Sequence, residues 1–125
     1  TLQAVLPAET WAQLVDYAGK RGIALQNFQG LDTWFMGLVI GITEMQIAGL
    51  DSSLGLDKHF AERAQAAGKQ VGALETADEQ FAMFDGMSQA EQLQQLQDAL
   101  GDVAAMEQEI NRMHALWRAG DAEAL

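Results

Sequence analysis

The sequence contains no cysteine, a single proline and few basic residues. Without cysteine there is no disulfide bond, no thiolate zinc site and no cysteine nucleophile. Seven Lys and Arg residues stand against eighteen Asp and Glu residues, which gives a formal net charge of -11 at pH 7. Because this charge repels phosphate, we expect no nucleic acid and no anionic membrane surface as a partner.

Common enzyme motifs are also missing. There is no G-x-S-x-G, no H-E-x-x-H, no P-loop and no G-x-G-x-x-G after a strand. The segment shows neither the basic start nor the small-residue cleavage site of a signal peptide, so a signal for export would lie outside it. We therefore expect no self-sufficient active site in these residues.

What the sequence does contain is helical periodicity. Its 125 residues, 49% of them apolar, suffice for one compact core, so we predict a single helical domain over residues 1–125. Apolar spacings of three and four predict a mainly α fold, a compact bundle of five or six helices with at most one or two short β-strands. The predicted helices cover residues 7–21, 24–29, 33–47, 57–67, 77–84 and 88–119, and the two strand candidates are residues 2–6 and 70–75.

Residues 33–47 are predicted to form the central core helix. One stripe carries Trp34, Leu38, Ile42 and Met45, while other apolar residues cover the remaining faces. A helix that is apolar all round is buried on most sides. Its short length and Glu44 argue against a membrane span, so we expect no membrane insertion by this segment. A buried Glu44 should have a raised pKa or a basic partner, for which Lys69 and Arg63 are the candidates.

The last predicted helix begins with a capping box, in which Ser88 and Glu91 exchange hydrogen bonds. Apolar residues follow at steps of three and four, but two consecutive steps of three around Gly101 break the phase. We therefore predict either one long helix bent near Gly101 or two helices that meet there.

Few residues are candidates for chemistry. His59 and Glu62 are three apart on a predicted helix and would share a face, which metal ligation can use, although such a pair is more often a plain surface feature. Glu75 follows the second strand candidate and could be a general acid or a metal ligand; its structural alternative is a favourable interaction with the next helix N-terminus. His114 lies beside the apolar stripe of the last helix and is predicted to be a packing residue.

Residues 55–96 resemble the TraB/GumN family, which is related to the Tiki proteins. The resemblance rests on the order of Gly55, Asp57, an alanine-rich helix, Gly68-Lys69, a short apolar segment, Leu74-Glu75-Thr76 and Gln80. The flanking stretches "LPAETWAQL", Trp34-Phe35 and "LWRAGDAEAL" agree with it, so the resemblance spans nearly the whole chain.

The resemblance implies a bacterial protein related to metal-dependent hydrolases, whose hallmark is two G-x-x-H motifs and a glutamate on strands that flank a helical middle region. Neither motif is present, because no glycine stands three residues before His59 or His114. The chain therefore resembles the helical middle region alone, a fragment with the catalytic halves missing. Residues 70–75 would then belong to a larger sheet.

These observations leave more than one function open. We expect the helical middle section of a TraB/GumN-like protein, inactive alone, with a divalent metal in the parent protein and no cofactor in this chain. The alternative is a non-catalytic protein-interaction or structural module with a protein partner. A stand-alone enzyme would need Glu75, His59 and Glu62 to converge. We also expect a homodimer, formed through the strand edge or the apolar face of the last helix.

Overall fold

The computed structural model describes residues 1–101 and 103–125, and within them the chain is mainly α-helical. The described residues form seven α-helices and two short 3₁₀ helices, with no β-strand. In chain order these are α1 (Leu2–Val5), α2 (Ala8–Arg21), η1 (Leu25–Asn27), α3 (Thr33–Ile47), η2 (Ser52–Leu54), α4 (Leu56–Ala66), α5 (Ala77–Asp85), α6 (Gln89–Gly101) and α7 (Val103–Ala119). The predicted fold class is therefore confirmed.

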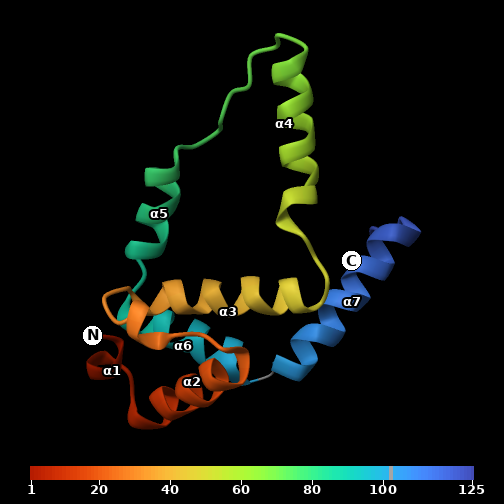
Figure 1. The fold of residues 1–125 in the computed structure, drawn as a ribbon. Helices are drawn as coiled ribbons and strands as arrows, with labels where there is room; N and C mark the ends of the chain where they lie inside the picture. The colour runs from red at the N-terminus through yellow and green to blue at the C-terminus, as the bar shows by residue number, and fades with distance from the viewer. Residues whose placement is uncertain (102) are drawn as a thin grey trace.

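The hydrophobic core lies between α1, α2, α3 and α6, which gather at one end of the molecule (Figure 1). Its buried apolar side chains come from these four helices and from the residue that follows α1. They are Leu2 and Leu6 at the start of the chain, Leu14 and Tyr17 on α2, Met36 and Ile40 on α3, and Leu96 on α6. This end of the molecule is a compact helical core.

Helix α2 ends where the sequence predicts. Gly22 adopts the left-handed conformation with φ 69° and follows the basic last turn formed by Lys20 and Arg21. A glycine accepts this conformation without steric cost, and cations favour a helix C-terminus. Its buried face carries Leu14, Tyr17 and Ala18, whereas Val15 is 45% exposed.

Helix α3 is buried on one face only. Trp34, Met36, Ile40 and Glu44 are buried against the rest of the core. The other residues of the predicted stripe, Leu38, Ile42 and Met45, are 38–55% exposed. The prediction of burial on most sides is therefore wrong for the single chain, since α6 and α2 cover one side of α3 and leave the opposite side open.

Neither strand candidate forms a strand. Residues 2–5 form α1, in which Leu2 is buried, and Leu6, which follows the helix, is buried as well. Residues 70–75 form an extended, exposed linker between α4 and α5, in which Val71 is 51% exposed. A strand needs a neighbour for its backbone hydrogen bonds, and the described residues offer none.

Helices α4 and α5 project from the core on the same side of α3, and the linker joins their far ends (Figure 1). We call α4, α5, the linker between them and the exposed side of α3 the open frame. Phe60, on α4, is 58% exposed. Helix α4 begins after Gly55 rather than after Asp57, and it ends before Gly68, whose φ is 69°.

The C-terminal part follows the prediction closely. The Ser88 hydroxyl accepts from the N–H of Glu91 at 3.3 Å, and the Glu91 carboxylate accepts from the N–H of Ser88 at 2.8 Å. Helix α6 ends at Gly101, and α7 begins at Val103 and runs in a different direction (Figure 1). The chain changes direction between the two helices, and residue 102, which joins them and decides between a bend and a break, lies outside the described residues.

Among residues 1–101 and 103–125, no helix combines the length and the hydrophobicity needed to cross a membrane.

Candidate functional site

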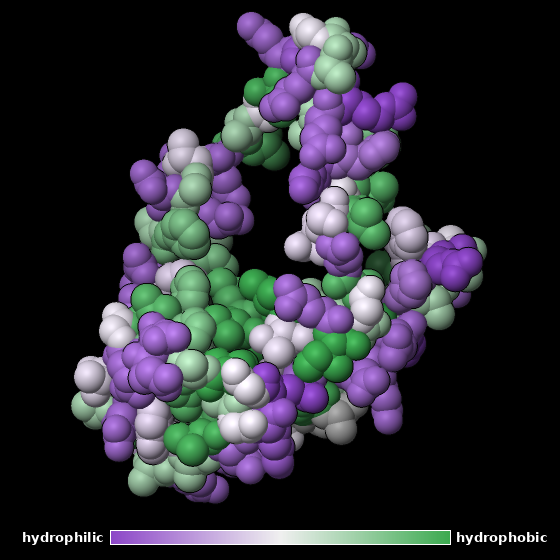
Figure 2. Space-filling view, viewed as in Figure 1, coloured by the Kyte–Doolittle hydropathy of each residue, from purple (hydrophilic) through white to green (hydrophobic). Residues whose placement is uncertain are grey.

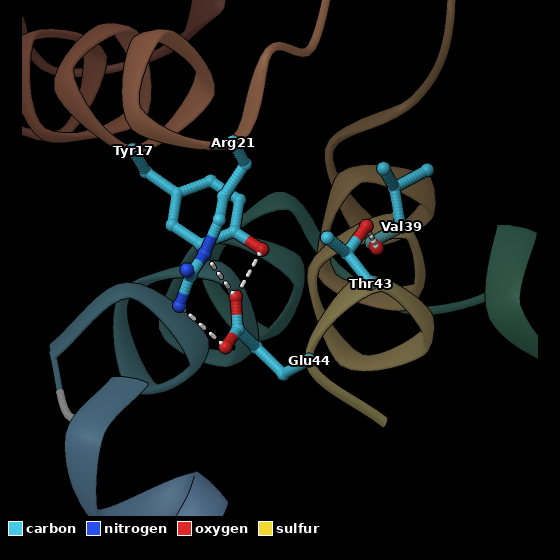
Figure 3. Close-up of polar contacts among 5 residues, drawn as sticks. All are labelled: Tyr17, Arg21, Val39, Thr43 and Glu44. Atoms are coloured by element: carbon cyan, nitrogen blue, oxygen red, sulfur yellow. Dashed lines mark hydrogen bonds and ion pairs between the residues drawn. The ribbon is translucent and has the colours of Figure 1, made fainter. Parts of the chain in front are cut away.

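A buried polar cluster joins the C-terminal end of α2 to the last turns of α3 (Figure 3). The Tyr17 hydroxyl donates to Glu44 Oε1 at 2.7 Å. Arg21 donates from Nε to Oε1 at 2.9 Å and from Nη2 to Oε2 at 2.8 Å. Glu44 itself is only 2% exposed. This is a bidentate pair with a third donor, the geometry that best compensates a buried carboxylate.

The spacing of the helices explains this cluster. Tyr17 and Arg21 are four residues apart on α2, so both side chains leave the same face of that helix. Burial first, and then the hydrogen bond to Glu44, raise the pKa of Tyr17 to about 12. The same carboxylate raises the pKa of Arg21. At neutral pH the phenol of Tyr17 therefore keeps its proton and Arg21 keeps its charge, and both donate hydrogen bonds to Glu44.

The predicted partners of Glu44 are wrong, although the predicted burial is confirmed. Lys69 and Arg63 belong to the α4 region and are exposed, whereas Arg21 lies on the helix that packs beside α3. Sequence reasoning did not single out Tyr17 or Arg21. Their i, i+4 spacing at the end of an amphipathic helix was the available signal.

A cleft of about 500 Å³ opens beside the cluster, between α2 and the junction of α6 with α7. It is lined by Gln13, Asp16, Tyr17, Lys20, Arg21, Leu100, Gly101, Val103 and Glu107. Its two cations are already paired, Lys20 with Asp16 at 2.7 Å and Arg21 with Glu44. Both cations of the cleft are therefore engaged within the chain, and we interpret the cluster as a clamp between helices.

The most extensive feature of the surface is apolar. Figure 2 shows hydrophobic side chains gathered over α3, at the base of the open frame. The large exposed apolar residues of α3, η2, α4, the linker and α5 are Leu38, Ile42, Met45, Ile47, Leu54, Leu56, Phe60, Val71, Leu74, Phe81 and Met83. Large contiguous apolar patches are rare on monomeric proteins and mark sites of interaction.

One contact ties α5 to the core at this base. Trp34 donates from Nε1 to the Asp85 carboxylate at 3.0 Å, and its ring stacks on Phe84 with centroids 4.9 Å apart. Thr76 and Glu79 form a capping box that begins α5. The C-terminal end of α5 is therefore fixed, while most of its surface is exposed.

A second, smaller apolar groove lies between the end of α3 and α7. It has a volume of about 230 Å³ and is lined by Met45, Leu50, Ile110, Met113, His114, Trp117 and Leu125. The ring of His114 stacks on Trp117 with centroids 6.5 Å apart. His114 therefore lies beside apolar residues, as predicted, although it is exposed.

The candidate chemical residues lie on the open frame. His59 and Glu62 are exposed on α4, and Glu75 is exposed in the linker just before α5. Within the part of the chain that the structure describes, no group of three or more His, Asp or Glu side chains is arranged to hold a metal ion. His59 instead meets the ring of Phe60 edge-on, with centroids 5.4 Å apart.

The fold and the surface define a helical module with a clamped core and an uncovered apolar side. A family model described as the TraB/PrgY/gumN family matches residues 1–125, the whole chain. The protein therefore belongs to this family, which confirms the resemblance found in the sequence. No curated protein and no solved structure matches it.

Proposed function

We propose that this chain is the helical, non-catalytic section of a TraB/GumN-like protein, and that it acts by docking a protein partner on the open frame. The observation that carries the proposal is the exposed apolar side of α3, where Leu38 is 38% and Ile42 is 55% exposed. A surface of this kind costs solvation free energy until a partner covers it.

The charge of the chain narrows the class of partner. At -11 the protein repels nucleic acid and anionic membranes. A protein partner meets the requirement, since its apolar side chains would cover the centre of the frame. The clamp of Tyr17, Arg21 and Glu44 supports this role by holding α2 against the other side of α3.

We place any metal-dependent hydrolase chemistry of the parent protein outside these residues. The donors present here do not fit a divalent metal site, because both G-x-x-H motifs are missing and His59, Glu62 and Glu75 belong to no metal-binding group among the described residues. A metal site needs three or four such ligands around one point. No catalytic step is therefore assigned to this chain.

Two measurements test the proposal. Calorimetric titration of the chain with zinc or manganese should show no stoichiometric binding, and tight binding lost in a Glu75→Ala variant would overturn the non-catalytic assignment. An apolar dye should fluoresce with the dilute protein, and Ile42→Ser should reduce the signal more than Val15→Ser does. Val15 is a matched control because it is 45% exposed, on α2 outside the frame. Equal losses in the two variants would contradict docking on the frame.

A further inference from the structure

We infer that the partner docked on the open frame is a second copy of this chain, so that α4 of each copy packs against α5 of the other. The inference rests on the proposed docking function and names its partner. It is carried by the exposed area of the chain, by the length of the two projecting helices and by their charges.

The exposed area is too large for a monomer of this size. The chain exposes 8900 Å², whereas a compact monomer of 13.6 kDa exposes about 6,600 Å². The excess is therefore about 2,300 Å² per chain. Obligate dimers bury roughly 2,000–5,000 Å² over both partners, or about half of that on each. Mutual burial of two open frames would account for the excess.

The two projecting helices are short. Helix α4 has 11 residues and α5 has 9, and isolated helices below about 12–15 residues are marginal in water. Helix α4 packs mainly against the neighbouring η2 of its own chain. Its apolar stripe of Leu56, Phe60 and Ala64, at steps of four, needs a second helix to cover it.

The charges of the two helices are complementary. Residues 56–69 contain Lys58, Arg63 and Lys69 and two acidic residues, so α4 with the glycine-lysine step after it is net basic in an acidic chain. Residues 75–85 contain four acidic residues and no basic one. Among the described residues, none of the three basic side chains makes a salt bridge, and neither Glu75 nor Asp78 makes one.

A two-fold dimer would use this complementarity twice. In an isologous interface, if α4 of one copy meets α5 of its partner, the reverse contact forms as well. Opposite charges across such an interface fix the register and disfavour other pairings. Two copies related by a two-fold axis would therefore cover the apolar stripes of both α4 helices and pair the basic groups of α4 with the acidic groups of α5.

Sedimentation equilibrium of the whole chain, from low to high micromolar concentration, tests the inference. We expect a dimer. Arg63→Glu should raise the dimer Kd by about fivefold to tenfold, and Asp78→Lys should do the same. The two changes combined in one chain should restore much of the affinity, because the charges are then exchanged across the interface.

Arg118→Glu is the matched control, since it makes the same change in net charge at an exposed position on α7. An equal weakening by Arg118→Glu would show that net charge alone acts, and would overturn the pairing of α4 with α5. Phe60→Asp should give a monomer that keeps the helical circular dichroism signal of the core. A variant that failed to fold would lose this signal.

A chain that stays monomeric at high micromolar concentration would overturn the inference, and X-ray scattering would then show what remains. An extended monomer would leave the docking function standing with a different protein partner. A compact monomer, with a radius of gyration of about 14 Å, would mean that the frame closes within one chain. Both the dimer and the docking function would then be refuted.

Discussion

Raising the pH should destabilise the protein through Tyr17. Burial and the hydrogen bond to Glu44 raise the pKa of this phenol to about 12 from the ordinary value of 10.0. Because the folded state keeps the proton over a range in which the unfolded chain loses it, the stabilising contribution is complete below about pH 10 and is lost as the pH rises towards about 12.

The size of the loss follows from these two pKa values. Between about pH 9 and about pH 11, a phenol with pKa values of about 12 when folded and about 10 when unfolded removes about 1.3 kcal/mol from the free energy of unfolding. Urea denaturation at the two pH values measures this loss. Tyr17→Phe should lack it, while the titration of lysines contributes equally to both proteins.

The composition makes a direct titration possible. Tyr17 is the single tyrosine of the chain, so the phenolate absorbance of the folded protein reports this residue alone. We expect a midpoint near about 12 in buffer and near about 10 in concentrated urea. Glu44→Gln should lower the midpoint of the folded protein, because it removes the negative charge beside the phenol. A folded midpoint near 10.0, the ordinary value, would refute the reasoning about the clamp.

Three further predictions concern the core and the helix caps. Ile40→Ala should lower the free energy of unfolding by about 2–5 kcal/mol. Ile42→Ala makes the same change two residues further along α3, where the side chain is 55% exposed, and should change this free energy by less than about 0.5 kcal/mol. Urea denaturation compares the two variants, and equal losses would mean that both sides of α3 are covered. Ser88→Ala should lower the free energy of global unfolding by about 1 kcal/mol, because α6 is part of the core. Thr76→Ala should chiefly increase amide hydrogen exchange within α5. Equal losses of global stability in the two variants would show that α5 unfolds together with the core. The hydrogen bonds from Ser88 lower the pKa of Glu91. This cap therefore contributes stability above the ordinary carboxyl pKa of 4.5, and the contribution is lost as the pH falls through the lowered pKa. Glu91→Gln should reduce the loss of stability at acid pH, and an unchanged dependence of stability on pH would contradict the role of the cap.

The sequence allowed the helices to be predicted, because their signals are local. The box of Ser88 and Glu91, the glycine after Arg21 and the break near Gly101 each act within a few residues of themselves. The residues that hold helices together were harder to predict. Glu44 was expected to be buried, but its partner Arg21 is 23 residues away, and only the packing of α2 on α3 brings the two together.

The two wrong strand predictions have a common physical cause. Short apolar runs fit a strand or a helix equally well, and a strand forms only if another strand supplies its hydrogen bonds. Leu2 therefore lies in a short helix and Leu6 directly follows it, and both side chains are buried in the core. Val71 and Leu74 lie in neither a helix nor a strand, and their side chains are exposed.

Helix α3 contributes both to the buried clamp and to the proposed interface. Its buried side carries Glu44, a charge that only the donors of α2 make tolerable, while its exposed side carries Leu38, Ile42 and Met45. An ordinary surface helix turns apolar residues inward and polar residues outward, whereas α3 also carries large apolar residues on its exposed side. Its buried side, with Met36 and Ile40 beside Glu44, is already packed within the chain, whereas its exposed side is not covered. The all-round apolar pattern of residues 33–47 therefore fits an assembly in which a second protein surface covers the side that this chain leaves open.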